Sequence, residues 1–131
     1  MMKKLTILLV IIFSFLFSTT SWGDWNYVVE NKSGSKFYYD KDRVRKSGKF
    51  IYFWELQDYI KPSEMGDLSY TGYTELDCSI FRFKMLKVQF FNKSMGEGEN
   101  IRDITPRDEW TYPHPESMME IIFNKICEEH Q

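Results

Sequence analysis

The stretch FYYDKDRVRKSGKFIYFWELQDY, residues 37–59, decides the fold, because its second half is the strongest strand pattern in the chain. From residue 49 to residue 59 the side chains alternate with the two-residue period of a β-strand. One face of this strand carries Phe50, Tyr52, Trp54 and Leu56, and the other carries Ile51, Phe53, Glu55 and Gln57. The first face is expected in the core. The second face is half apolar, so a partial cover is expected there as well.

Alternation and turn residues predict four further strands, at residues 25–30, 36–40, 70–77 and 80–91. The polar segment 40–48 is expected to be a loop with at most one helical turn. In the last strand the apolar set changes face, which predicts a bulge or break close to Met85 and Leu86. Gly72 indicates a bulge or a close backbone approach. The proline-containing segment 101–115 is expected to be an irregular crossing or to contain a short edge strand.

A C-terminal helix is predicted from a capping signal and an apolar stripe. Ser117 and Glu120 have the S-x-x-E spacing of a capping box. Apolar side chains then recur at three- and four-residue spacing, at Met119, Ile122, Phe123, Ile126 and Cys127. The stripe is expected to lie on the sheet.

The chain has two cysteines, Cys78 and Cys127. An even number in an exported chain predicts a disulfide, and two cysteines allow one pairing. The closed loop has about 50 residues, for which the chain-entropy model gives roughly 4 kcal/mol of stabilisation. The alternative is a reactive pair, but the C-x-x-C spacing typical of such pairs is absent.

Residues 1–23 have the layout of a secretory signal peptide, and residues 24–131 are then expected to form one domain. Lys3 and Lys4 precede the apolar stretch 5–17, and small residues stand before a cut at Asp24. The alternative is a membrane anchor, but the apolar stretch is shorter than the roughly 20 residues that span a bilayer. The sequence around the cut offers no cysteine for a lipid anchor. An exported protein, periplasmic, released or at the cell surface, is predicted, with no transmembrane segment after cleavage.

Composition narrows the classes of protein. The formal net charge is −2 and no long basic run occurs, which argues against a nucleic-acid partner. Aromatic residues make up 18% of the chain, which suits a sheet with bulky faces and excludes a disordered chain.

Chemical motifs are scarce. His114 and His130 are not placed at metal-ligand spacing from cysteines or acidic pairs. The segment MGEGEN, residues 95–100, lacks the third glycine of a phosphate-binding loop, and no serine stands in a G-x-S-x-G elbow. No catalytic residue, metal site or cofactor is therefore predicted.

The first half of the quoted stretch carries a candidate contact surface, made up of Tyr39, Lys41, Arg43, Arg45 and Lys46. Two interpretations stay open. The basic residues can form a solvated loop balanced by Asp40 and Asp42, or they can contact an acidic partner or a polyanion. The tyrosine would then add amphipathic contact area, as at protein interfaces.

Several short motifs stand in a specific order along the chain. After the quoted stretch come SY and ELDC (69–78), FRF (81–83), MGEG (95–98) and W..P.PES (110–117), followed by a helix with Cys127. In this order the chain resembles the surface-adhesin protein E family of Gram-negative bacteria over nearly all of residues 24–131. The resemblance implies an α+β domain, with an antiparallel sheet of about six strands and a C-terminal helix tied to it by a disulfide.

The resemblance also implies a binding protein and not an enzyme, since the named family members bind host matrix proteins such as vitronectin and laminin. No ligand-contact residue carries over by position. The function predicted from the sequence is an exported, non-catalytic binding protein of the cell envelope. Its partner would be a protein or an envelope macromolecule, with a host matrix protein as one possibility. The alternative is a periplasmic protein that binds a small ligand or an envelope component and has no adhesin role.

Overall fold

The computed structural model describes residues 24–130, so the predicted signal peptide at 1–23 lies outside the described residues. The strands are β1 (Trp25–Glu30), β2 (Lys36–Asp40), β3 (Arg45–Ser47), β4 (Phe50–Asp58), β5 (Ser69–Asp77), β6 (Arg82–Phe91) and β7 (Asn100–Ile104). The helices are the short 3-10 turns η1 (Lys41–Arg43) and η2 (Ser94–Gly96) and the α-helix α2 (Met118–His130). Within residues 24–130, no helix has the length and apolar character needed to cross a membrane.

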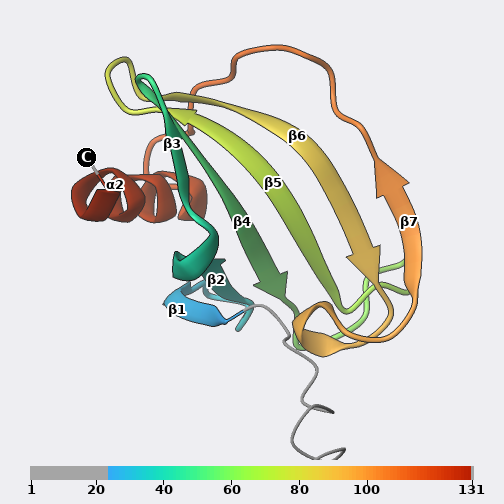
Figure 1. Ribbon diagram of the computed structural model, residues 1–131. Coiled ribbons are helices and arrows are strands. Elements are labelled where there is room, and N and C mark those ends of the chain that lie inside the picture. The colour runs from blue at the N-terminus through green and yellow to red at the C-terminus, as the bar shows by residue number, and fades with distance from the viewer. Residues whose placement is uncertain (1–23, 131) are drawn as a thin grey trace, which may run out of the picture.

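The strands form one antiparallel sheet in the order β1-β2-β4-β5-β6-β7, and β3 pairs with β4 off this path (Figure 1). β3 and β2 follow one another along the same edge of β4, because Arg45 pairs with Tyr52 and Tyr39 pairs with Glu55 farther on. The predicted α+β class is confirmed. The prediction of a loop at 40–48 is wrong in part, because residues 45–47 pair with β4, and η1 supplies the helical turn.

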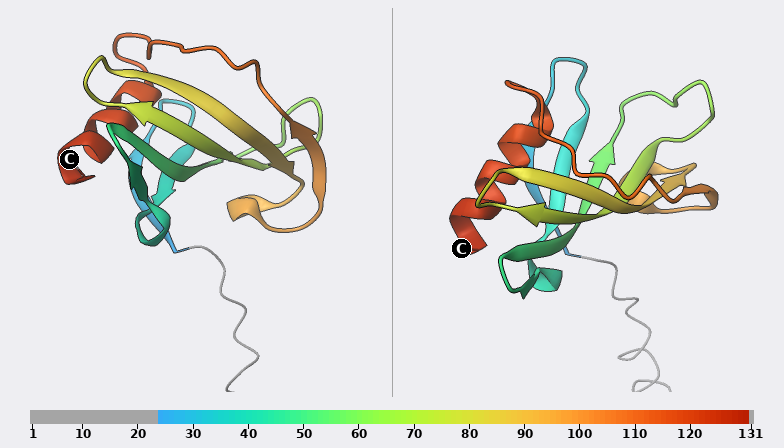
Figure 2. Two further views of the ribbon diagram at one scale, coloured as in Figure 1. Left: turned by 45° about the horizontal axis from the view of Figure 1, so that its top comes forward. Right: turned by 90° about the horizontal axis from the view of Figure 1, so that it is seen from above.

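Helix α2 packs on one face of the sheet and buries the core there (Figure 2). The Phe123 ring meets Phe53 edge-on at 5.9 Å and Phe83 at 4.8 Å between ring centroids. The prediction that the Phe50 face of β4 is buried is therefore wrong for most of the strand. Ile51 and Phe53 are the buried pair, at 2% and 0% exposure, and the Phe50 side is half-buried. The pattern of one strand cannot show which face the helix covers.

The irregularities predicted in β5 and β6 are present. Tyr73 pairs with Lys87 and Thr74 pairs with Met85, so Leu86 is an extra residue and forms the predicted bulge. Gly72 marks a close approach, because a Cβ atom there would lie 2.8 Å from the Met85 methyl carbon. The edge strand β7 confirms the short-strand alternative for the segment after residue 100.

The start of α2 follows the capping signal with one change of partner. The Glu120 N–H donates to the Ser117 hydroxyl at 3.2 Å, as a capping box requires. The Glu120 carboxylate accepts from the Glu116 N–H at 3.3 Å instead of from the residue predicted to be the cap.

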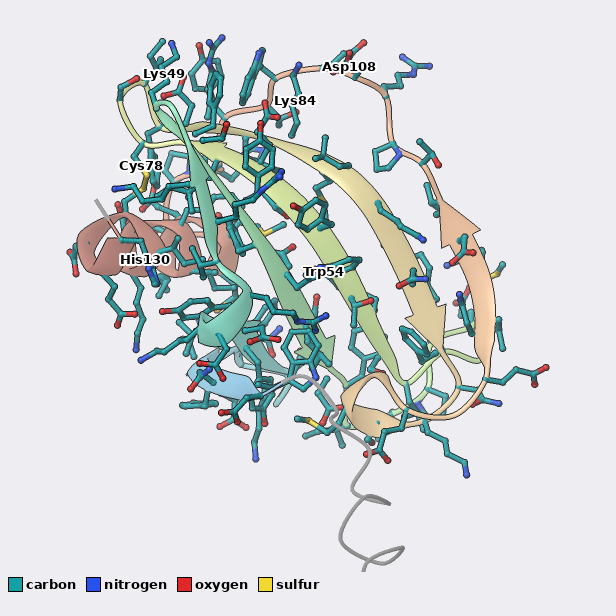
Figure 3. All side chains as sticks on the ribbon, in the orientation of Figure 1. Lys49, Trp54, Cys78, Lys84, Asp108 and His130 are labelled. Atoms are coloured by element: carbon teal, nitrogen blue, oxygen red, sulfur yellow. A yellow bond between two sulfur atoms is a disulfide. The ribbon has the colours of Figure 1, made fainter. Side chains whose placement is uncertain are left out.

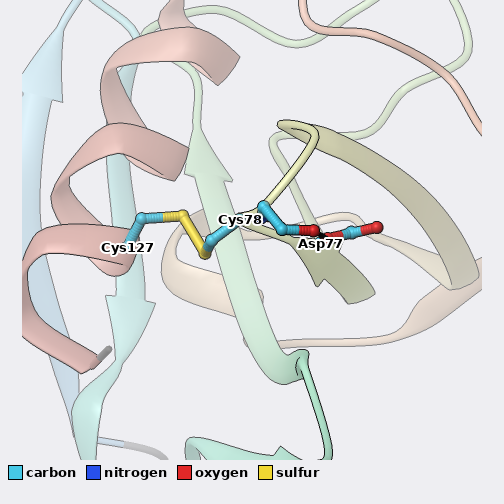
Figure 4. Close-up of a disulfide and its surroundings, with 4 residues drawn as sticks. Asp77, Cys78 and Cys127 are labelled. Atoms are coloured by element: carbon cyan, nitrogen blue, oxygen red, sulfur yellow. Dashed lines mark hydrogen bonds between the residues drawn. A yellow bond between two sulfur atoms is a disulfide. The ribbon is translucent and has the colours of Figure 1, made fainter.

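The Cys78–Cys127 disulfide is confirmed and ties the residue after β5 to the C-terminal part of α2 (Figure 4). The two Cα atoms are 5.9 Å apart, and the bridge closes a loop with a sequence separation of 49 residues. The covalent bond thus holds the helix over the strands that its apolar stripe covers.

Replacing the helical cysteine should destabilise the protein strongly. Cys127→Ser is expected to lower the melting temperature of the oxidised protein by about 15 °C or more, because roughly 4 kcal/mol of chain-entropy stabilisation is lost. Differential scanning calorimetry measures the shift, and the wild-type protein with a reductant is the matched control. Equal melting temperatures for the variant and the oxidised wild type would show that core contacts alone hold α2.

One ionisable side chain, that of Glu55, is buried without a hydrogen-bond or ion-pair partner among the described residues. The Glu55 side chain is 2% exposed, and neither carboxyl oxygen has a hydrogen-bond partner among the described residues. Burial raises the pKa of Glu55 to about 8, because the charged form loses its hydration. At neutral pH the folded protein therefore holds this carboxyl in its protonated form.

This burial makes stability depend on pH. The pKa of Glu55 in the folded protein lies above the ordinary value of 4.5. Between pH 4.5 and about 8 the folded state therefore binds a proton that the unfolded state has lost. The free energy of unfolding consequently falls as the pH rises through this range. The glutamine of the Glu55→Gln variant cannot ionise. The decrease in the free energy of unfolding between pH 5 and pH 8 should therefore be about 3 kcal/mol smaller in this variant than in the wild type. Urea unfolding at the two pH values measures the difference. Parallel pH dependences for variant and wild type would contradict the assignment.

Candidate functional site

The face of the sheet opposite α2 carries a continuous row of aromatic side chains, here called the aromatic face. It consists of Phe50, Tyr52 and Trp54 on β4, Tyr73 on β5, and Trp110 from the crossing segment after β7. The Trp54 and Tyr73 rings are 5.0 Å apart, and Phe50 stacks on Trp110 at 5.5 Å with an interplanar angle of 28°. Figure 3 shows Trp54 over β4 and β5, on the side away from α2. All five side chains are half-buried.

Four cationic side chains lie on these rings. Arg45 stands 4.8 Å from the Tyr52 ring centroid, and Lys49 stands 5.4 Å from that of Phe50. Arg82 and Lys84 both lie over Trp110, at 4.3 Å and 4.6 Å. These cation–π contacts hold the cations against the aromatic surface. Aromatic residues and arginine are enriched in the cores of protein interfaces.

Trp110 reaches the aromatic face because backbone hydrogen bonds join its segment to β6. Phe83 and Thr111 form an isolated antiparallel bridge, with N–H to oxygen distances of 2.8 Å and 2.9 Å. Lys84 adds an ion pair to Asp108 at 2.8 Å. The sequence alone did not identify Trp110 as a site residue, because nothing in the irregular stretch 105–117 indicates where that segment crosses the sheet.

A buried carboxylate fixes two of the cations. Asp77 is 0% exposed and precedes the bridged Cys78 (Figure 4). Its oxygens accept from the Ser79 hydroxyl at 2.6 Å and from the Arg82 Nε at 3.2 Å, and the Lys49 Nζ lies 3.8 Å away. Burial opposes ionisation, but the hydrogen bonds outweigh it, so the pKa of Asp77 is lowered. The carboxylate therefore stays charged and orients Arg82 beneath Trp110.

The contact-surface prediction for Tyr39 is wrong, because this side chain is fully buried. Its exposed fraction is 0%, and its hydroxyl donates to the Glu129 carboxylate near the end of α2. Burial raises the pKa of Tyr39, and the hydrogen bond from Tyr39 lowers the pKa of Glu129. Tyr39 thus docks the end of the helix and is not available to a partner.

The predicted basic residues do not form one cluster. Lys41 lies 3.8 Å from Glu129 on the helix side, and Arg43 donates to Asp40 at 2.6 Å. The alternation of β3 sends Arg45 and Lys46 to opposite faces, and only Arg45 joins the aromatic face. A binding role for Lys41, Arg43, Arg45 and Lys46 stays a prediction.

The described residues offer little for metal chemistry. Among residues 24–130, no group of three or more His, Cys, Asp and Glu side chains is arranged to hold a metal ion. The two histidines lie apart, with His130 against Tyr39 at the end of α2.

In this fold, a helix covers one face of the sheet and the other face carries aromatic and cationic side chains. Such an arrangement is typical of a binding domain with an exposed sheet face. The sequence profile of the family described as "Surface-adhesin protein E" matches residues 25–128. The chain belongs to this family.

Solved structures of Haemophilus influenzae protein E have the same fold. One shows 15% identity and a TM-score of 0.58, covering 86% of this chain and 89% of the other. A second crystal form shows 15% identity and a TM-score of 0.60, covering 86% and 93%. A structure from a non-typeable strain shows 16% identity and a TM-score of 0.53, covering 84% and 79%. A search of curated proteins found no significant match.

The hydrogen bond between two neighbours on the aromatic face can be tested by titration. The side chain of Glu75, the cross-strand partner of Tyr52, raises the pKa of the Tyr52 phenol by accepting its hydrogen bond. Glu75→Ala should therefore lower the Tyr52 pKa toward its ordinary value. NMR titration of tyrosine labelled at the ring carbon bearing oxygen measures the change, with Tyr112 as an internal control. An unaltered Tyr52 titration would contradict this pairing.

Proposed function

We propose that the chain is an exported, non-catalytic adhesin of the cell envelope that binds a protein partner through its aromatic face. Residues 1–23 would direct export, and residues 24–131 would form the binding domain. Membership of the surface-adhesin protein E family supports the adhesin role. The proposal rests above all on the position of α2, which covers one face of the sheet and leaves the aromatic face open.

The charges on this face indicate an acidic partner. Arg45, Lys49, Arg82 and Lys84 all lie on its rings, although the whole chain has a formal net charge of −2. Asp77, Glu75 and Asp108 offset three of these four charges, so the cations exceed these carboxylates by one. A partner surface with carboxylates around an apolar centre would pair with the cations and cover the rings. Host matrix proteins such as vitronectin and laminin, the ligands implied by the family, are the first partners to test.

The second candidate function is binding of a small ligand or envelope component inside the periplasm. A depression of about 470 Å³ favours it, formed between the β1–β2 turn and the segment after β4. Ser33, Ser35 and Lys61 are among the side chains that line it. Tyr59 and Ile60 give the same depression apolar surface, so it suits a small ligand that has both apolar and polar groups.

Location separates the two functions. Protease treatment of intact cells, followed by immunodetection, should remove the protein if it is an adhesin, while a periplasmic marker is spared. Protection in intact cells, with release of the protein only by osmotic shock, would reject the adhesin role and favour the periplasmic function.

The aromatic face is tested by binding measurements on immobilised vitronectin and laminin. Trp110→Ala and Arg45→Ala should each weaken binding at least about tenfold, as expected for central aromatic and arginine residues of an interface. Ile121→Ala and Lys32→Ala are controls, because they remove an exposed apolar side chain on α2 and an exposed charge in the turn between β1 and β2. Equal losses in the control variants would reject the aromatic face as the binding surface.

A further inference from the structure

A separate depression of about 190 Å³ lies at the end of the aromatic face, between η1 and η2. Its volume is below the roughly 300–1,000 Å³ of sites for drug-sized ligands, so it suits one small ring. The side chains that give it chemical character are Trp25, Arg43, Trp54, Thr71, Gln89 and Phe91.

The sheet register places these side chains together. Thr71 and Gln89 are cross-strand partners on β5 and β6, so their hydroxyl and amide form one polar row in the floor. Trp54 stands on β4 beside this row. β2 separates the strands of Trp25 and Trp54, and two strand spacings put the backbones of these strands about 10 Å apart. The two indoles thus line one depression that has a polar floor.

Hydrogen bonds hold η2 beside the depression. The Met95 N–H donates to the Asp58 carboxylate at 2.8 Å, and the Gly96 N–H donates to the Ser69 hydroxyl at 2.9 Å. A Cβ atom at Gly96 would stand 3.2 Å from the Leu56 methyl, so this turn packs closely on the sheet. These contacts fix the position of η2 at the edge of the depression.

One cation is fixed at this site by a buried carboxylate. The Arg43 Nε donates to Asp40 at 2.6 Å, and the Asp40 side chain is 1% exposed while the Arg43 side chain is 54% exposed. The bond uses one N–H of a guanidinium that has five. The remaining N–H groups can bind a second carboxylate in the two-pronged geometry that arginine favours.

We propose that this depression binds the ring of an acidic sugar, a hexuronate. The C–H groups on one face of a pyranose carry partial positive charge and pack on the electron-rich face of an indole. Thr71 and Gln89 can exchange hydrogen bonds with the ring hydroxyls, and Arg43 can bind the carboxylate. An acidic peptide would use the cation but would leave the two indoles and the polar floor without partners.

The sugar site and the proposed protein interface overlap at one residue and can be tested separately. Trp25, Arg43, Thr71 and Gln89 lie outside the aromatic face, and only Trp54 belongs to both. If vitronectin and laminin do not bind, the sugar-site proposal is unaffected. If the sugar does not bind, the protein-interface proposal is unaffected.

The test uses two probes that differ only at the sugar C6, methyl β-D-glucuronide and methyl β-D-glucoside. The full sequence is expressed, the exported protein is labelled with ¹⁵N, and each probe is titrated while the indole N–H signals are followed by NMR. The glucuronide should shift the signals of Trp25 and Trp54 while that of Trp110 stays unchanged. It should bind at least about tenfold more tightly than the glucoside, because one more charge-assisted hydrogen bond forms.

Variants assign the roles of the side chains. Arg43→Gln should remove the preference for the glucuronide and leave glucoside binding unchanged, whereas Lys32→Ala, which removes an exposed charge in the turn between β1 and β2, should change neither. Trp54→Ala should abolish binding of both probes, and Trp110→Ala should preserve it. If Trp54→Ala does not fold, Gln89→Ala decides, with an expected loss of at least about threefold for both probes.

Three outcomes would overturn the proposal. The first is the absence of indole shifts at about 50 mM glucuronide. The second is equal affinity for the two probes. The third is an acetylated Asp-Glu dipeptide that shifts Trp25 and Trp54 as strongly as the sugar, which would assign the site to acidic peptides.

Discussion

The contact of Phe123 with Phe53 and Phe83 determines which face of the sheet becomes the core. Once α2 packs there, the Ile51 side of β4 is closed and the opposite side stays open. The disulfide at Cys127 holds the same helix covalently. One helix cannot cover both faces of a sheet, so the bulky residues on the far side are stabilised by stacking on one another and by cations. The open aromatic face is thus a consequence of how the core is built.

Most elements of the fold could be predicted from the sequence, because their signals are local. The strand alternation, the helix cap and the bulge at Leu86 each depend on residues near one another in the chain. The buried face of β4 could not be predicted in this way. Phe50 and Phe53 are equally apolar, and the choice between them depends on contacts from β6 and α2, which are distant in sequence. The short strand β3 was missed because the polar stretch 45–47 gains its conformation by pairing with β4.

The candidate site was harder to predict than the fold. The basic residues were visible as a run, but a run in sequence is not a cluster in space. Tyr39 turns into the core, Arg43 binds Asp40, and only Arg45 lies on an aromatic ring of the open face. Trp110 was missed because an irregular crossing segment carries no periodic pattern. Its place is fixed by a bridge and an ion pair to β6, which the sequence does not reveal.

The disulfide and the core have a consequence for folding. The core joins Phe37 of β2 to Ile126 of α2, so the contacts that complete it are far apart along the chain. Such high contact order slows folding, because large loops must close before the apolar contacts form. The bridge between Cys78 and Cys127 adds an oxidation step that cytosolic conditions do not favour. The covalent part of this structure is therefore completed only in a compartment where thiols oxidise.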